Sequence, residues 1–393
     1  MGISSTIIDP EERLTNPSNR DDADAGPTVV HLDSQRDIRR GLSIPCITVL
    51  DANGRVIEAE QRNVIRFVAQ QGFGADIIFG AGTTGECNRI ANRERQRLIR
   101  IQVDEAGQIN RDISVDGRRI EAWVGVTAAT RKETLENLEC AIAEGAEAAV
   151  IAPLSIQDLG DMVRFFQREV SDLFDHQGRA VRIFLYDNAD IAANPRIPHM
   201  RTRDVKRLSR LPFIRGVKVS ASRRVLGNYT KGAAHFKDKG EFGIYVGNAM
   251  LMFQVFKLED GLAGRIREYW NRYLLHNELP IGVVAGPANV LPREWQRAWR
   301  ACYAGDERLM SIYKSAFKKF DAACGFGRDG NRVDKSIACF KHALKIEGVI
   351  ETDFLATGTL RLDDEERREF ALRYSAIKSN LSQLTDAQWT SRN

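Results

Sequence analysis

Short apolar runs alternate with amphipathic segments over most of the chain between residues 44 and 285. The runs are too apolar to alternate cleanly, which is typical of parallel strands that are covered on both faces. We predict eight strands, at residues 44–50, 75–80, 122–126, 148–153, 181–186, 214–220, 243–247 and 282–285. Most of the segments between them follow the helical period, for example 58–71, 92–106, 131–144 and 159–174.

Eight strands separated by helices predict an α/β fold of the closed (β/α)8 type, a TIM barrel. Beyond Pro292 only helical patterns remain, at 293–304, 306–320, 334–347 and 363–379, and residues 1 to about 40 are polar. The predicted division is therefore an N-terminal arm (1–41), the barrel (42–291) and a C-terminal helical extension (292–393).

The main alternative fold is a doubly wound open sheet that binds a dinucleotide. Residues 80–85 read Gly-Ala-Gly-Thr-Thr-Gly and formally match the glycine fingerprint of such folds. The match follows the second strand, and the next helical pattern starts only near Asn92. We therefore favour the barrel.

Composition narrows the function classes. The 393 residues are 43% hydrophobic, and 57 Lys+Arg against 53 Asp+Glu leave a formal charge of +4 with the signs interspersed, so we expect no nucleic-acid partner. No apolar run is long enough to span a membrane. The six cysteines lack C-x-x-C spacing and indicate a reducing, cytoplasmic setting. The histidines show no metal-ligand spacing, and we expect neither metal nor cofactor.

Two polar residues stand near the carboxyl ends of apolar strands, where barrel enzymes place their chemistry. Lys218 shares a strand face with Ser220, opposite the valines on either side, and Tyr186 ends the preceding strand. Desolvation favours the uncharged amine of a buried lysine, which is a nucleophile that forms Schiff bases. The alternative is a strand-end lysine that reaches water or pairs with a carboxylate.

The second strand ends in residues 80–86, Gly-Ala-Gly-Thr-Thr-Gly-Glu. Its glycines permit unusual backbone angles and close approach of a ligand, and backbone N–H groups in such a turn can hold a carboxylate. A plain strand-to-helix turn with hydroxyl caps is the alternative.

Together these runs resemble the dihydrodipicolinate synthase / N-acetylneuraminate lyase family of Schiff-base class I aldolases. The anchors are residues 82–86 (Gly-Thr-Thr-Gly-Glu), 185–186 (Leu-Tyr) and 216–218 (Gly-Val-Lys), and the resemblance covers about 42–372. It implies that Lys218 forms an imine with pyruvate or a longer 2-oxo acid, while Tyr186 and Thr83 relay protons. The binding residues that it implies are Gly82, Thr84, Gly85, Gly247 and Asn248.

The chain also departs from the family. Ile191 stands where dihydrodipicolinate synthases have an arginine that binds the second substrate, and residues 153–155 read Pro-Leu-Ser where Pro-Tyr-Tyr is common. Asp187 and Asp190 are expected to repel an acidic second substrate, which favours an aldehyde or sugar-acid fragment.

The expected function is a pyruvate-linked lyase or aldolase that works as a homo-oligomer, a tetramer or dimer, as its relatives commonly do. A 2-keto-3-deoxy sugar-acid dehydratase, dihydrodipicolinate synthase itself, and a non-catalytic barrel that binds a 2-oxo acid are the alternatives.

Overall fold

The computed structural model describes residues 38–113, 118–236, 241–256, 280–327 and 332–390, and the predicted N-terminal arm lies almost wholly outside this part. Eight parallel strands form a closed barrel, with β1 pairing with both β2 and β8. The strands are β1 (Gly41–Pro45), β2 (Ile77–Gly80), β3 (Glu121–Gly125), β4 (Ala148–Ile151), β5 (Arg182–Asn188), β6 (Ile214–Ser220), β7 (Gly243–Val246) and β8 (Gly282–Val284). The predicted TIM barrel is confirmed.

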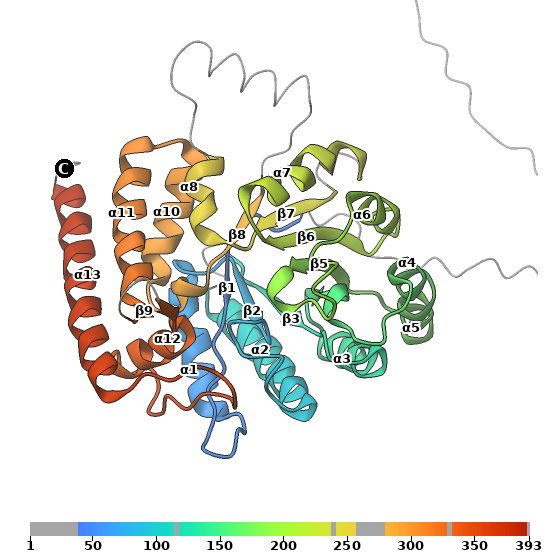
Figure 1. The fold of residues 1–393 in the computed structure, drawn as a ribbon, viewed down its shortest axis with the longest axis horizontal. Helices are drawn as coiled ribbons and strands as arrows, with labels where there is room; N and C mark the ends of the chain where they lie inside the picture. Colours follow the sequence, from blue (N-terminus) through green and yellow to red (C-terminus); the bar gives the residue numbers. More distant parts are fainter. Residues whose placement is uncertain (1–37, 114–117, 237–240, 257–279, 328–331, 391–393) are drawn as a thin grey trace, which may run out of the picture.

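Helices cover the outside of the barrel (Figure 1). They are α1 (Glu58–Ala69), α2 (Asn92–Ile113), α3 (Arg131–Glu144), α4 (Met162–Phe165), α5 (Ser171–Gln177), α6 (Thr202–Leu208), α7 (Arg223–Gly232) and α8 (Met252–Val255). Good end signals define several of them. For example, Thr130 caps α3 by accepting from Glu133 N–H, and Gly145 ends it in the left-handed conformation.

The C-terminal extension is helical, as predicted, and consists of α10 (Pro292–Ala304), α11 (Glu307–Ala323), α12 (Ser336–Ile346) and α13 (Asp364–Thr390). α10, α11 and α13 stand side by side on one flank of the barrel, near α1 and α8 (Figure 1). Trp295 of α10 stacks on Phe317 of α11 with ring centroids 4.0 Å apart. Both rings are buried, so this contact joins the extension into one apolar core with the outer face of the barrel.

Inside the barrel, aromatic side chains fill the space below the carboxyl ends of the strands. Trp123 stacks on Phe184 at 4.0 Å and meets Tyr245 edge-on at 4.9 Å. At the opposite end of the strands, Arg182 pairs with Glu121 at 3.0 Å. The barrel therefore has a packed floor, and its open chemistry is confined to the carboxyl-terminal end.

Two local predictions were wrong. The first strand was predicted at 44–50, but β1 spans Gly41–Pro45, and residues 46–50 form a buried loop whose apolar side chains pack under the helices. The predicted helix 159–174 is broken into α4, a π-helical turn Phe166–Val170 and α5. The register shift of the π turn lets Phe165, Phe166 and Val170 all be buried.

The Trp295–Phe317 stack predicts a stability effect. Phe317→Ala leaves a cavity beside the indole, and we expect it to lower the free energy of unfolding by about 3–5 kcal/mol. Leu372→Ala is the control, because Leu372 is 75% exposed on α13 and its loss should change stability by less than about 0.5 kcal/mol. Urea unfolding measures both; equal midpoints would show that the stack contributes little.

Candidate active site at the carboxyl end of the barrel

Lys218 lies inside the barrel, near its carboxyl-terminal end. Its Nζ is 3.8 Å from the centroid of the Tyr186 ring and 4.9 Å from that of Phe79, and the residue is 4% exposed. The side chain of Lys218 has no ion pair or hydrogen bond within the described segments. The alternatives for this lysine, a carboxylate pair or a head group in water, therefore do not match its surroundings.

The register of the sheet places the tyrosine beside the lysine. Tyr186 on β5 is the direct partner of Lys218 on β6, and both side chains face the interior because strand residues alternate. Val217 and Val219 face the outer helices, as the alternation predicts.

The Tyr186 hydroxyl sits among three polar side chains. Asn188 Nδ2 donates to it at 3.0 Å, Ser220 Oγ donates to it at 3.3 Å, and Thr83 Oγ1 lies at 3.3 Å, with either oxygen able to donate. The structure thus brings Thr83, Tyr186 and Lys218 together. Ser220 and Asn188 were not predicted as site residues. Ser220 could have been, since it shares the Lys218 face of β6.

The turn after β2 borders the same space. Within it, the N–H groups of Gly85, Glu86 and Cys87 donate to carbonyls of Gly82 and Thr83. No hydrogen bond in the described part of the chain uses the backbone N–H of Thr83 or Thr84. These two amides are the donors that the turn leaves open for an anionic group.

Close contacts explain why glycine occupies three of the predicted site positions. A Cβ on Gly82 would lie 2.9 Å from the Phe79 ring, and one on Gly85 would lie 2.8 Å from the Cys46 carbonyl oxygen. At the end of β7, a Cβ on Gly247 would lie 2.9 Å from the backbone of Ser220, so β6 and β7 need a glycine here to approach each other. Asn248 follows it and is exposed at the rim.

Residues 39–152 match the model of the Dihydrodipicolinate synthetase family. The predicted family resemblance is confirmed. The family match also supports the prediction of an enzyme.

The same fold occurs in solved structures of low sequence identity. Dihydrodipicolinate synthase from Bacteroides thetaiotaomicron is 19% identical, with 87% of this chain and 100% of that chain covered at a TM-score of 0.65. KD(P)GA from T. tenax is 21% identical, with 86% of this chain and 99% of that chain covered at a TM-score of 0.61. YagE is a prophage protein of the dihydrodipicolinic acid synthase family from E. coli K12, solved in complex with pyruvate. It is 17% identical, with 86% of this chain and 98% of that chain covered at a TM-score of 0.64. The search among curated proteins gives no match.

The departures from the dihydrodipicolinate synthetase family can now be placed. Ile191 packs against the aromatic cluster inside the barrel, so an apolar side chain occupies the position expected for an arginine. Leu154 lies in a short 3-10 turn, Pro153–Ser155, and its carbonyl accepts from Ala193 N–H at 2.7 Å. The loops after β4 and β5 are therefore joined directly.

One expectation about charge was wrong. Asp187 alternates with Tyr186 and points outward, where Tyr229 Oη donates to it at 2.8 Å and His199 Nδ1 lies at 3.2 Å. Burial raises the pKa of Asp187, and its bonds to Tyr229 and His199 oppose that rise. Asp187 is fully buried and cannot repel a substrate in the barrel, whereas Asp190 is exposed at the mouth.

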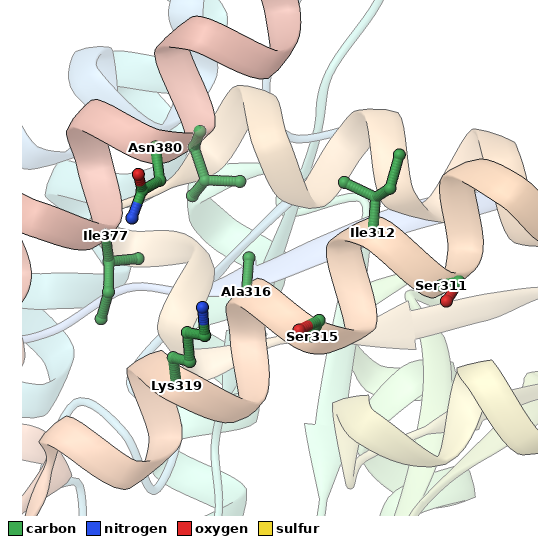
Figure 2. A pocket seen from close by; sticks show the side chains of 8 residues that line it. Ser311, Ile312, Ser315, Ala316, Lys319, Ile377 and Asn380 are labelled. Carbon is green, nitrogen blue, oxygen red and sulfur yellow. The ribbon is translucent and has the colours of Figure 1, made fainter.

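Two grooves lie elsewhere on the molecule. Figure 2 shows one of about 550 Å³ between α11 and α13, lined by Ser315 and Lys319 from α11 and by Ile377 and Asn380 from α13. Another, of about 560 Å³, lies between α1 and α2. Neither is lined by a predicted site residue.

Across the described ranges, no cluster of three potential metal ligands occurs, and no helix is long and apolar enough to cross a membrane.

The Gly247–Ser220 contact generates a prediction for the site. Gly247→Ala forces β7 away from Ser220, and we expect it to destabilise the fold by about 1–3 kcal/mol and to disturb the Tyr186 hydroxyl cluster. The matched control is Gly227→Ala in α7, where a Cβ meets nothing within 4 Å. That variant should leave the urea midpoint unchanged or raise it, because alanine favours helix. Similar losses in both variants would contradict the packing argument.

Proposed function

We propose that the protein is a lyase of the class I aldolase type, in which Lys218 forms a Schiff base with pyruvate or a related 2-oxo acid. The observation that supports it most directly is the enclosed Lys218 amine, 3.8 Å from the Tyr186 ring and without a carboxylate partner in the described structure. A lysine amine enclosed beside a tyrosine is the type of nucleophile that forms Schiff bases with carbonyl substrates. The family match and the pyruvate complex of YagE add support.

The proposed reaction starts when the Lys218 amine adds to the C2 carbonyl of the oxo acid. Loss of water from the adduct leaves a protonated imine, which withdraws electrons from C3. Removal of a C3 proton then gives the enamine; alternatively, the C4 hydroxyl loses its proton, the bond between C3 and C4 breaks, and the C4 fragment leaves as an aldehyde. The enamine takes up a proton or an aldehyde, and hydrolysis of the imine releases the product and restores the lysine.

Tyr186 and Thr83 have the proton-transfer roles in this proposal. Their hydroxyls lie 3.3 Å apart, and the Tyr186 ring lies directly beside the lysine nitrogen. A proton can therefore pass between the reacting nitrogen and the barrel mouth. The open amides of Thr83 and Thr84, with the Thr84 hydroxyl, hold the carboxylate. Gly82 and Gly85 shape that turn, while Gly247 and Asn248 border the bound acid at the end of β7.

The second substrate is proposed to be a neutral or polyhydroxylated aldehyde, such as a sugar-acid fragment. Ile191 offers no charge where an acidic partner would need one, and Asp190 is exposed at the mouth. A dehydratase that uses the same imine is the second candidate, because the imine also supports β-elimination of a hydroxyl group. Homo-oligomeric assembly, a cytoplasmic location and the three-part division of the chain remain predictions.

Borohydride trapping tests the imine. With pyruvate present, reduction should add one pyruvate, less an oxygen atom, to the peptide that contains Lys218, because the imine is converted to a stable amine. Mass spectrometry of the digested protein locates the adduct. Lys218→Ala should carry none, while Lys231→Ala, which changes an exposed lysine, should be labelled like the wild type. A wild-type protein left unlabelled, or labelled equally in Lys218→Ala, would refute the proposal.

Tyr186→Phe tests the proton relay. Loss of the hydroxyl should slow turnover by about 10²–10⁴-fold, as expected for a general acid–base group, while the imine still forms slowly. Release of pyruvate from candidate sugar acids, compared with loss of water without chain cleavage, measures the activity and separates lyase from dehydratase. Tyr303→Phe is the control, because Tyr303 is 57% exposed. Unchanged turnover in Tyr186→Phe would remove the tyrosine from the mechanism.

A further inference from the structure

A buried ion pair connects the turn after β2 to the C-terminal helices. Lys341 Nζ on α12 lies 2.5 Å from Glu86 Oε2, and the two side chains are 1% and 0% exposed. Glu86 is the last residue of the Gly-Thr-Thr-Gly-Glu run and adopts a positive φ of 57°, which is uncommon for a residue with a side chain. The pair thus joins a strained point of the turn to a helix far along the chain.

Both charged groups of the pair also form hydrogen bonds to other residues. Glu86 Oε1 accepts from Ala356 N–H at 2.9 Å and from Thr359 Oγ1 at 2.6 Å. Lys341 Nζ also donates to the Phe354 carbonyl at 2.6 Å. Burial lowers the pKa of Lys341, and Glu86 opposes that effect. The carboxylate therefore holds α12 and the segment 354–359 in one arrangement against the turn.

Further contacts support the same part of the turn. Arg89 donates to Thr359 Oγ1 at 2.7 Å, and Arg95 donates to the Cys87 carbonyl. A Cβ on Gly286 would lie 3.4 Å from both Thr84 Oγ1 and the ring of Phe340, so the segment just after β8 lies between Thr84 and α12. The turn is thus held from its outer side by residues beyond the barrel strands.

Stability alone is a weak reason for such a pair. Desolvation of two charges roughly cancels their attraction, and apolar residues of similar volume often serve the fold as well. What an ion pair with directed hydrogen bonds supplies is a defined geometry. Glu86 lies two residues from Thr84, whose amide is open.

We propose that Glu86 and Lys341 are positioning residues that orient the Thr83–Thr84 amides for the carboxylate of the 2-oxo acid, so that the C-terminal extension helps to set affinity for that substrate. This inference rests on the proposed function. The pair touches neither the amine of Lys218 nor the hydroxyl of Tyr186, and its effect should fall on substrate binding more than on the chemical step.

The test is the pyruvate concentration that gives half-maximal borohydride trapping, measured on the full chain. Lys341→Met keeps the stem and removes the charge, and we expect it to raise this concentration about 10- to 100-fold through misplacement of the turn. Thr359→Val removes one hydrogen bond from Glu86 at a partly exposed site and should remain folded. It should raise the half-saturating concentration by a smaller factor, about threefold or more.

The matched control is Lys335→Met. Lys335 also forms a 2.6 Å ion pair, with Glu366, but that pair joins the start of α12 to α13 and does not contact the turn. It should lower the unfolding midpoint without changing half-saturation. The inference fails if wild type is trapped and Thr359→Val and every folded Lys341 variant share its pyruvate dependence. If wild type itself is not trapped, the proposed function fails instead, which is a different result.

Discussion

The site depends on the enclosure of one lysine amine by the closed sheet. The β5–β6 register pairs Tyr186 with Lys218 directly, and the alternation of strand side chains turns both toward the barrel interior. The aromatic floor formed by Trp123, Phe184 and Tyr245 closes the space below them. Within the described structure the Lys218 nitrogen has the ring faces of Tyr186 and Phe79 for neighbours and no carboxylate partner.

The fold could be predicted where local signals and periodicity agree. Strand β6 and helix α3 were predicted at the residues where the structure has them. In both cases a segment with charged residues or glycine follows the apolar pattern and marks the end of the element. The first strand was misplaced, because residues 46–50 are as apolar as the strand itself. A buried loop and a buried strand look alike in sequence. The π turn at Phe166–Val170 was missed for a related reason, since a one-residue insertion leaves the helical pattern almost unchanged.

The site was predictable to the extent that it follows strand alternation. This rule places Lys218 inside the barrel, and applied consistently it would also have included Ser220 and sent Asp187 outward to Tyr229. It would have included Asn188 as well, because Asn188 lies two residues after Tyr186 on the same face of β5 and donates to its hydroxyl. The Glu86–Lys341 pair was beyond prediction, since its partners are 255 residues apart in the chain.

Different parts of the structure hold the two halves of the proposed oxo-acid site. The amine is held by backbone pairing of β5 with β6, which tolerates little movement because each strand is locked to two neighbours. The turn proposed to bind the carboxylate is outside the sheet and contains two non-glycine residues at positive φ, Ala81 and Glu86. Its outer contacts come from side chains of the extension. Under this proposal, a change in the packing of α12 alters how the turn binds the 2-oxo acid, while Lys218 stays in place. In the proposed mechanism, substrate affinity and the nucleophile are therefore separable, and the C-terminal helices act on the first.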